Sequence, residues 1–180
     1  MLVSIFQVIK KESDGIEILN EKIIYVINAL ATNCNLIGGE YISPLTAYDQ
    51  MLRAKVVFNE TKERGLSTLD GKAFFHYVFS PDPNDDVSVF ELAKLAEEIC
   101  HFLANYSGIF QVVYAVHIRD VSTGDFLEAP HIHFIANNID FNNGRRFNSS
   151  KDILADMKSN IDLITKKYNI SAIRRHDWSQ

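Results

Sequence analysis

The stretch EAPHIHFIAN, residues 128–137, places two histidines one residue apart inside a run that has the composition of a β-strand. Side chains alternate between the two faces of a strand. His131 and His133 therefore share one face, and the apolar even-numbered residues share the other. Such a pair either supplies two ligands to a metal ion or is simply two polar residues on a sheet. A third ligand on a neighbouring strand would favour the metal site.

A third histidine comes from the strand expected just before, in the segment IFQVVYAVHI, residues 109–118. Its even-numbered positions are all bulky and apolar, whereas its odd-numbered positions include Gln111 and His117. We expect the even face to pack on helices and the odd face to stay open. If the end of this strand pairs with the start of the next, His117 converges with His131 and His133. Three imidazoles suit a divalent cation that keeps a coordination position open for substrate.

The remaining pattern predicts an α+β fold in a single domain over residues 1–180. The polar residues 119–130 would join the two histidine strands as an antiparallel hairpin. Helices would cover one face of a mostly antiparallel central sheet. A short strand is expected after the turn at 142–147. The other expected elements are strands at 2–9 and 71–83, helices at 16–30, 45–63, 85–108 and 149–169, and a loop at 32–44.

The composition restricts the class of protein. The formal net charge is −5, which argues weakly against a nucleic-acid partner. Residues 145–180 nevertheless carry eight Lys or Arg against four Asp, so this segment is either a phosphate-contacting surface or a solvated helix face. No apolar run is long enough to span a membrane. Two distant cysteines, Cys34 and Cys100, predict a reducing, cytoplasmic location.

Tyr25 lies off the apolar stripe of the first expected helix, about 200° around the helix from its neighbours on that stripe. A tyrosine on that polar side is either a rim residue or a nucleophile that forms a phosphotyrosine. On the strand expected at 71–83, His76 and Ser80 share one face. Alternation alone leaves open whether they join the polar face of the sheet or lie on an exposed edge. The stripe itself consists of Ile16, Leu19, Ile23, Ile27 and Leu30.

The segments KIIYVINA, FFHYVFSPDP, VHI and HIHFIANNIDFNNGRRFNSSKD occur in this order over residues 22–152. With their spacing, they resemble the relaxase, or mobilisation nuclease, domain of conjugative and mobilisable elements. That family belongs to the HUH endonucleases, named for two histidines that flank a hydrophobic residue. The resemblance covers about residues 20–175. It implies the α+β fold of that family, with the histidine pair on a central strand and helices around the sheet.

The resemblance also implies roles for particular residues. Tyr25 matches the nucleophile, and His117, His131 and His133 match the three metal ligands. Ser80 and Asn137 match residues associated with DNA contact and with the histidine motif. Arg145, Arg146 and Lys151, which follow the histidine strand, are candidates for backbone phosphates. The chain departs from many relatives at Ala129, where they have a histidine, at Arg119, where they have an acidic residue, and in a longer connection between His117 and His131.

The activity that follows is site- and strand-specific DNA nicking and rejoining, dependent on Mg²⁺ or Mn²⁺, with a 5′-phosphotyrosyl intermediate. The expected partner is single-stranded DNA at a transfer origin, where nicking would start mobilisation of a plasmid or other mobile element. Accessory mobilisation or coupling proteins would assist, and no membrane is involved. Two alternatives stay open: a rolling-circle replication initiator of the same superfamily, and a DNA-binding accessory protein without catalysis.

Overall fold

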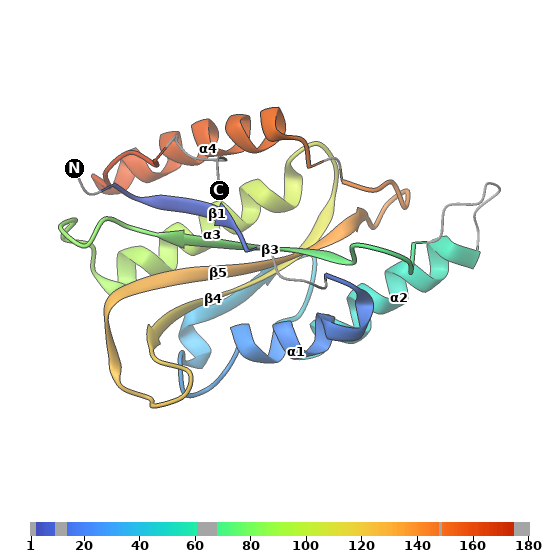
Figure 1. The fold of residues 1–180 in the computed structure, drawn as a ribbon, viewed down its shortest axis with the longest axis horizontal. Coiled ribbons are helices and arrows are strands. Elements are labelled where there is room, and N and C mark those ends of the chain that lie inside the picture. The colour runs from blue at the N-terminus through green and yellow to red at the C-terminus, as the bar shows by residue number, and fades with distance from the viewer. Residues whose placement is uncertain (1–2, 10–13, 61–67, 148, 175–180) are drawn as a thin grey trace.

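The protein forms an antiparallel sheet with helices packed on it, as the computed structural model shows for residues 3–9, 14–60, 68–147 and 149–174 (Figure 1). Within these ranges five strands pair in the order β1-β3-β5-β4-β2, and all four pairings are antiparallel. The predicted α+β class is confirmed. The strands are β1 (Ile5–Val8), β2 (Ile37–Glu40), β3 (Phe74–Ser80), β4 (Phe110–Arg119) and β5 (Phe126–Asp140), and the helices are α1 (Ile16–Val26), α2 (Ala47–Glu60), α3 (Val89–Asn105) and α4 (Lys151–Thr165).

β5 is the central strand, with β3 on one side and β4 on the other. β4 and β5 form the predicted antiparallel hairpin. β5 begins at Phe126 rather than at His131, so the end of the segment predicted as a polar connection belongs to the strand. The hairpin therefore continues past the first histidine of β5, as Figure 1 shows at the lower left.

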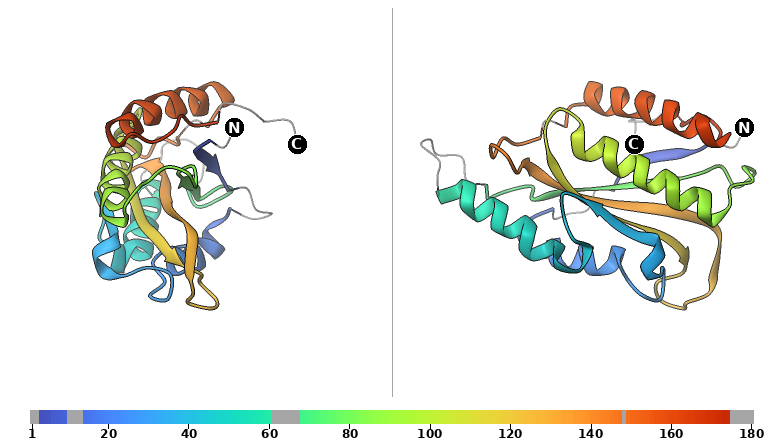
Figure 2. Two further views of the ribbon diagram at one scale, coloured as in Figure 1. Left: turned by 90° about the vertical axis from the view of Figure 1, so that its left-hand side faces the viewer. Right: turned by 180° about the vertical axis from the view of Figure 1, so that it is seen from behind.

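Helices cover both faces of the sheet, so the prediction of one covered face and an open odd-numbered face is wrong. The even-numbered side chains of β4 and β5 pack in one core with α3 and α4. Figure 2, right, shows the molecule from behind, with α3 crossing in front of the sheet and α4 beside it. On the other face, α1 and α2 pack on Val113, Ala115 and Ile135. These three odd-numbered residues are apolar and wholly buried, and they form a second hydrophobic surface. The sequence pattern did not indicate it, because polar residues such as Gln111 and His117 occupy the same face of β4.

Local signals explain where the two long helices on the back begin. Ser88 and Glu91 form a reciprocal capping box at the start of α3, which satisfies backbone N–H groups that have no partner within the helix. The predicted Ser cap of α4 is Ser150, whose hydroxyl accepts a hydrogen bond from the Ile153 amide. None of the described helices has the length and apolar character that a membrane span needs.

Three other predictions are corrected. The predicted loop at 32–44 contains the edge strand β2, because its glycine-rich backbone fits close against β4, where any side chain at Gly38 would collide with the Tyr114 ring. α1 ends at Val26, and Leu30 is exposed beyond it. The short strand expected after residue 147 is reduced to one bridge that pairs Ile139 with Arg146. The predicted end of the second helix, at residue 63, lies outside the described residues.

Replacing Phe134 by alanine should test the back core. This ring is fully buried between the sheet and the helices, and its removal leaves a cavity. We expect the free energy of unfolding to fall by about 3–5 kcal/mol in urea titrations. Leu163→Ala, at an exposed position on α4, is the matched control and should change it by less than about 0.5 kcal/mol. Similar losses for both variants would contradict this placement of the core.

Candidate metal centre

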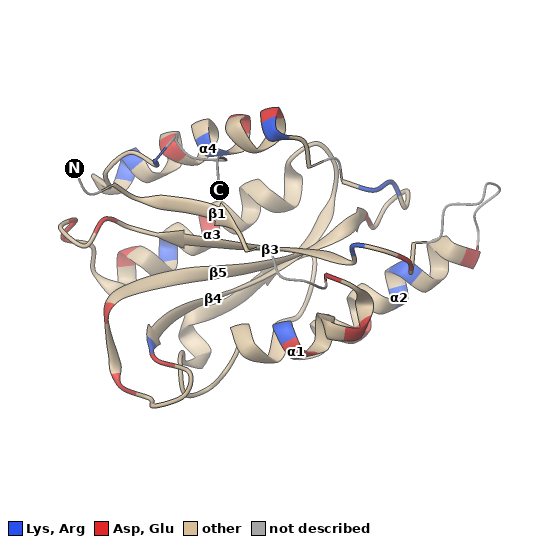
Figure 3. Ribbon diagram, in the orientation of Figure 1, with Lys and Arg blue, Asp and Glu red and all other residues tan. Residues whose placement is uncertain are grey.

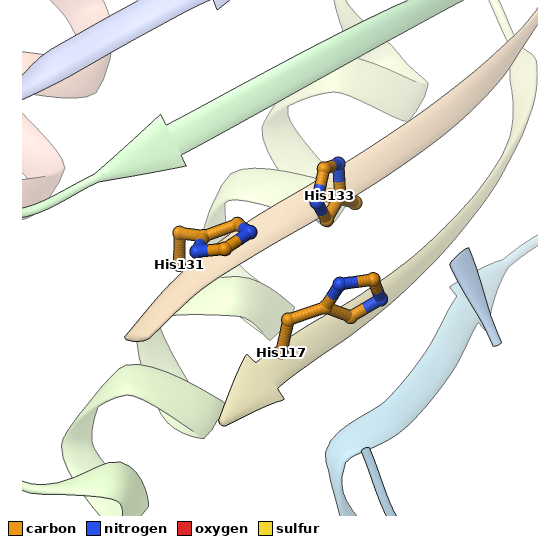
Figure 4. Close-up of side chains that lie close together, drawn as sticks. All are labelled: His117, His131 and His133. Atoms are coloured by element: carbon orange, nitrogen blue, oxygen red, sulfur yellow. The ribbon is translucent and has the colours of Figure 1, made fainter. Parts of the chain in front are cut away.

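Three histidines converge on the face of the sheet that α1 covers (Figure 4). His117 on β4 lies directly opposite His131 on β5, and His133 follows on the same face. One ring nitrogen from each lies within 4.8 Å of the others. The ring centroids of His117 and His133 are 4.4 Å apart, and those of His131 and His133 are 4.9 Å apart. The strand pairing thus brings together three side chains that are up to 16 residues apart in the chain.

Two of these rings are held by backbone carbonyl groups. The Nε2–H of His117 donates to the Val26 carbonyl oxygen at 2.7 Å, and the Nδ1–H of His131 donates to the Ala129 carbonyl oxygen at 3.2 Å. A neutral imidazole that donates through one nitrogen keeps a lone pair on the other. Both rings therefore have one nitrogen free to bind a cation, in the arrangement that metal-binding histidines usually show.

The third ring, His133, is held by another histidine. Its Nδ1 lies 2.8 Å from Nε2 of His76, on the neighbouring strand β3. Its Nε2 is buried and has no hydrogen-bond partner among the described residues. A buried nitrogen without a partner is costly, and a bound cation would supply the missing interaction. The sequence left the side of His76 open; the pairing of β3 with β5 places it behind His133.

Burial keeps His117 and His133 uncharged. Desolvation is the main cause that lowers the pKa of both His117 and His133 below the usual 6.5, and the neighbouring imidazoles lower each pKa further. Neutral imidazole is the form that binds metal ions. The rings are therefore in their ligand form at neutral pH.

Tyr25 lies beside the cluster. Its ring centroid is 5.4 Å from that of His133 and 5.6 Å from that of His117. The tyrosine is in the last turn of α1, one residue before Val26, whose carbonyl oxygen holds His117. The side chain is 38% exposed, so the phenol is accessible while its ring contacts the imidazoles. The geometry therefore places the Tyr25 ring next to two of the three imidazoles.

The other predicted site residues differ in their positions. Ser80 is half-buried on β3; Val78 lies opposite His133, so Ser80 shares that face two residues further along. Asn137 is buried, and its amide donates to the Gln111 side chain at 3.1 Å. It faces the interior, and this placement does not support a direct DNA contact.

Arg145, Arg146 and Lys151 are not brought to the cluster. They follow the far end of β5, and the strand from His131 to Asp140 spans roughly 30 Å at the usual rise per residue. Figure 3 shows the basic residues of this loop at the end of the sheet away from the β4–β5 hairpin. The guanidinium of Arg146 donates to the Asp70 carbonyl oxygen at 2.6 Å. Closeness in sequence to the histidine strand did not indicate closeness in space.

Comparison with known proteins agrees with this arrangement. Residues 25–170 match the family model described as relaxase, MobA/VirD2-like, nuclease domain. The fold is similar to that of the MobM relaxase domain (MOBV; Mob_Pre), solved as a Mn-bound crystal structure with plasmid pMV158 oriT DNA of 22 nucleotides. The TM-score is 0.64 over 99% of this chain and 94% of that chain, at 12% sequence identity, so this likeness concerns the fold. No curated protein matches the chain by sequence.

The buried histidines predict how stability depends on pH without metal. In the unfolded chain their pKa values return to about 6.5. Below that pH the unfolded state takes up protons that folded His117 and His133 do not. The free energy of unfolding should therefore be fully maintained above about pH 6.5 and fall as the pH drops below it. Urea titrations in EDTA at pH 7.5, 6.5 and 5.5 measure this. A His117→Gln/His133→Gln variant that kept the same pH dependence would contradict it.

Proposed function

The chain belongs to the MobA/VirD2-like relaxase family, and we propose that its histidine cluster and Tyr25 nick and rejoin one DNA strand at a transfer origin. The observation that carries this proposal is the contact of the Tyr25 ring with imidazoles that share a common ligand position. A nucleophile beside a cation site is an arrangement suited to phosphoryl transfer. The nick would start the transfer of a mobile element.

His117, His131 and His133 would hold the divalent cation. Three nitrogen donors suit Mn²⁺ better than Mg²⁺, which is bound mostly through oxygen. When bound, such a cation polarises the scissile phosphate. The hydrogen bonds that the rings of His117 and His131 donate to the Val26 and Ala129 carbonyl oxygens, and the bond between His133 and His76, would orient the three rings toward the cation.

Tyr25 would carry out the covalent step. Its phenolic oxygen attacks phosphorus, the bond from phosphorus to the 3′-oxygen breaks, and the phenolic proton is released. The products are a 3′-hydroxyl group and a 5′-phosphotyrosyl ester. The ester keeps the phosphodiester linkage energy, so the reverse attack by the 3′-hydroxyl rejoins the strand without ATP.

DNA contact close to the nick would come from Ser80, which lies on the same face as the cluster. Arg145, Arg146 and Lys151 would meet the same DNA molecule only if it ran along the length of β5. Their contribution would then be to general affinity through phosphates rather than to the chemistry. Single-stranded DNA at the origin is the proposed substrate because the backbone must enter a site partly covered by α1.

Tyr25→Phe should abolish the covalent product. The variant keeps the ring that contacts the histidines but lacks the attacking oxygen, so DNA binding should be unchanged. The assay uses supercoiled plasmid that carries the DNA flanking the gene, with Mn²⁺, and detects the adduct after denaturation with detergent. Tyr41→Phe, at an exposed tyrosine directly after the edge strand β2, should retain full nicking. Adduct formation by Tyr25→Phe would show that another residue is the nucleophile.

His76→Ala should weaken Mn²⁺ binding. Removal of the partner of His133 leaves that ring free to rotate and to change tautomer, and loss of such partners typically costs about 10- to 100-fold in metal affinity. Isothermal titration calorimetry measures the effect. His76→Gln restores an acceptor and should recover part of the affinity. The control is His101→Ala, an exposed histidine on α3. Equal affinities for wild type and His76→Ala would mean that His133 needs no support.

A further inference from the structure

Arg119 and Phe126 face each other on the β4–β5 hairpin, just beyond the metal centre. Their residues are paired across the two strands, and the Arg119 guanidinium lies 4.4 Å from the centroid of the Phe126 ring. Phe126 is nevertheless 73% exposed. Both residues belong to features in which the sequence departs from many relatives. Arg119 replaces an acidic residue, and Phe126 lies in the long connection between His117 and His131.

The pair lies next to the metal centre along the hairpin. Arg119 follows His117 by two residues on β4, and Phe126 lies opposite Arg119 on β5. The register shift between the His117–His131 pair and the Arg119–Phe126 pair places its extra residues on β5, between Phe126 and His131. Two residues of strand span about 7 Å, so the Arg119–Phe126 pair begins about that far from the histidines.

The hairpin holds this pair in a defined position. The backbone amides of Ile118 and Arg119 both donate to the Ala31 carbonyl oxygen, at 2.9 and 3.1 Å, which ties β4 to the segment after α1. The turn is closed by the Asp120 carboxylate, which accepts hydrogen bonds from the Ser122 and Thr123 amides at 2.8 and 2.9 Å. A surface that is already ordered loses little conformational entropy when it binds a ligand.

The chemistry of the hairpin favours stacking over charge attraction. Arg119 is the only Lys or Arg in residues 119–130, which also contain Asp120, Asp125 and Glu128. The Asp120 carboxylate is already engaged in the turn, and its pKa is lowered to about 2, first by a hydrogen bond from the Ser122 hydroxyl and then by those from the Thr123 and Ser122 amides. A net acidic segment attracts DNA phosphates poorly. An exposed aromatic ring backed by a guanidinium, however, offers its surface to an unpaired base of any sequence.

We propose that Phe126, supported by Arg119, is a stacking platform for an unpaired base of the DNA strand close to the cleaved phosphate. The proposal rests on the proposed function, since it takes single-stranded DNA as the substrate. The platform positions the strand; it takes no part in the covalent step. The alternative is that the contact between Phe126 and Arg119 only stabilises the hairpin. The two interpretations differ in whether DNA binding depends on the bases.

The experiment measures binding of two fluorescein-labelled oligonucleotides of about 20 nucleotides by anisotropy, in EDTA. One has a mixed base sequence, and the other has the same backbone with abasic sites throughout. Phe126→Ala should bind the intact strand about tenfold or more weakly than wild type and the abasic strand within about twofold. Phe126→Trp should retain wild-type affinity for the intact strand. Phe90→Ala is the matched control, because Phe90 is also exposed with a cation, Lys94, over its ring, but lies on α3.

Two outcomes would overturn the platform. The first is unchanged binding of the intact strand by Phe126→Ala, and the second is an equal loss on both oligonucleotides, which indicates a structural role. Failure of the proposed function looks different. If Phe126→Ala weakens binding only of the strand that carries bases, but the wild-type protein forms no Tyr25 adduct, the nuclease is contradicted and the platform is supported. Wild type that binds neither oligonucleotide contradicts both.

Discussion

The antiparallel pairing of β4 with β5 is the constraint on which the site depends. Its register sets His117 opposite His131 and, two residues along, brings His133 onto the same face. A shift of one residue would turn one strand's histidines to the opposite face of the sheet, among the apolar side chains under α3 and α4. The apolar residues between the histidines, such as Ile132, lock that register because they are buried in the back core. Core packing and ligand geometry are thus consequences of one alignment.

A second link joins this sheet to the first helix. The His117 imidazole donates to the carbonyl oxygen of Val26, at the end of α1, and its other nitrogen faces the ligand position. The same ring therefore holds both the metal site and the helix end that carries Tyr25. The amides of Ile118 and Arg119 donate to the carbonyl oxygen of Ala31, in the segment after α1, so several hydrogen bonds connect the segment around Tyr25 with the histidine strand β4. A relative position held this way suits a reaction that needs in-line geometry.

The two ends of β5 have different characters. The cluster end carries the histidines, two of which are buried, whereas the far end contains a buried lysine, Lys55, whose ammonium group donates to the Asn138 side chain. Burial, and secondarily the charge of Arg146, lowers the pKa of Lys55 to about 7. A lysine enclosed this way contributes to the interior rather than to a phosphate contact. Lys55 is therefore not among the positive charges that a ligand can reach at the surface.

The sequence by itself determined the α+β class and the common face of His131 and His133, because strand alternation is a local property that residue order encodes. It could not determine that helices cover both faces, nor that the glycine-rich β2 is a strand, because those outcomes depend on contacts between distant segments. The position of His76 behind His133 also required the pairing of β3 with β5. Distance along the chain misled for Arg145, since an extended strand carries the next residues far away. Only the tertiary structure decides which groups meet, because strand register and helix docking set distances that residue order does not contain.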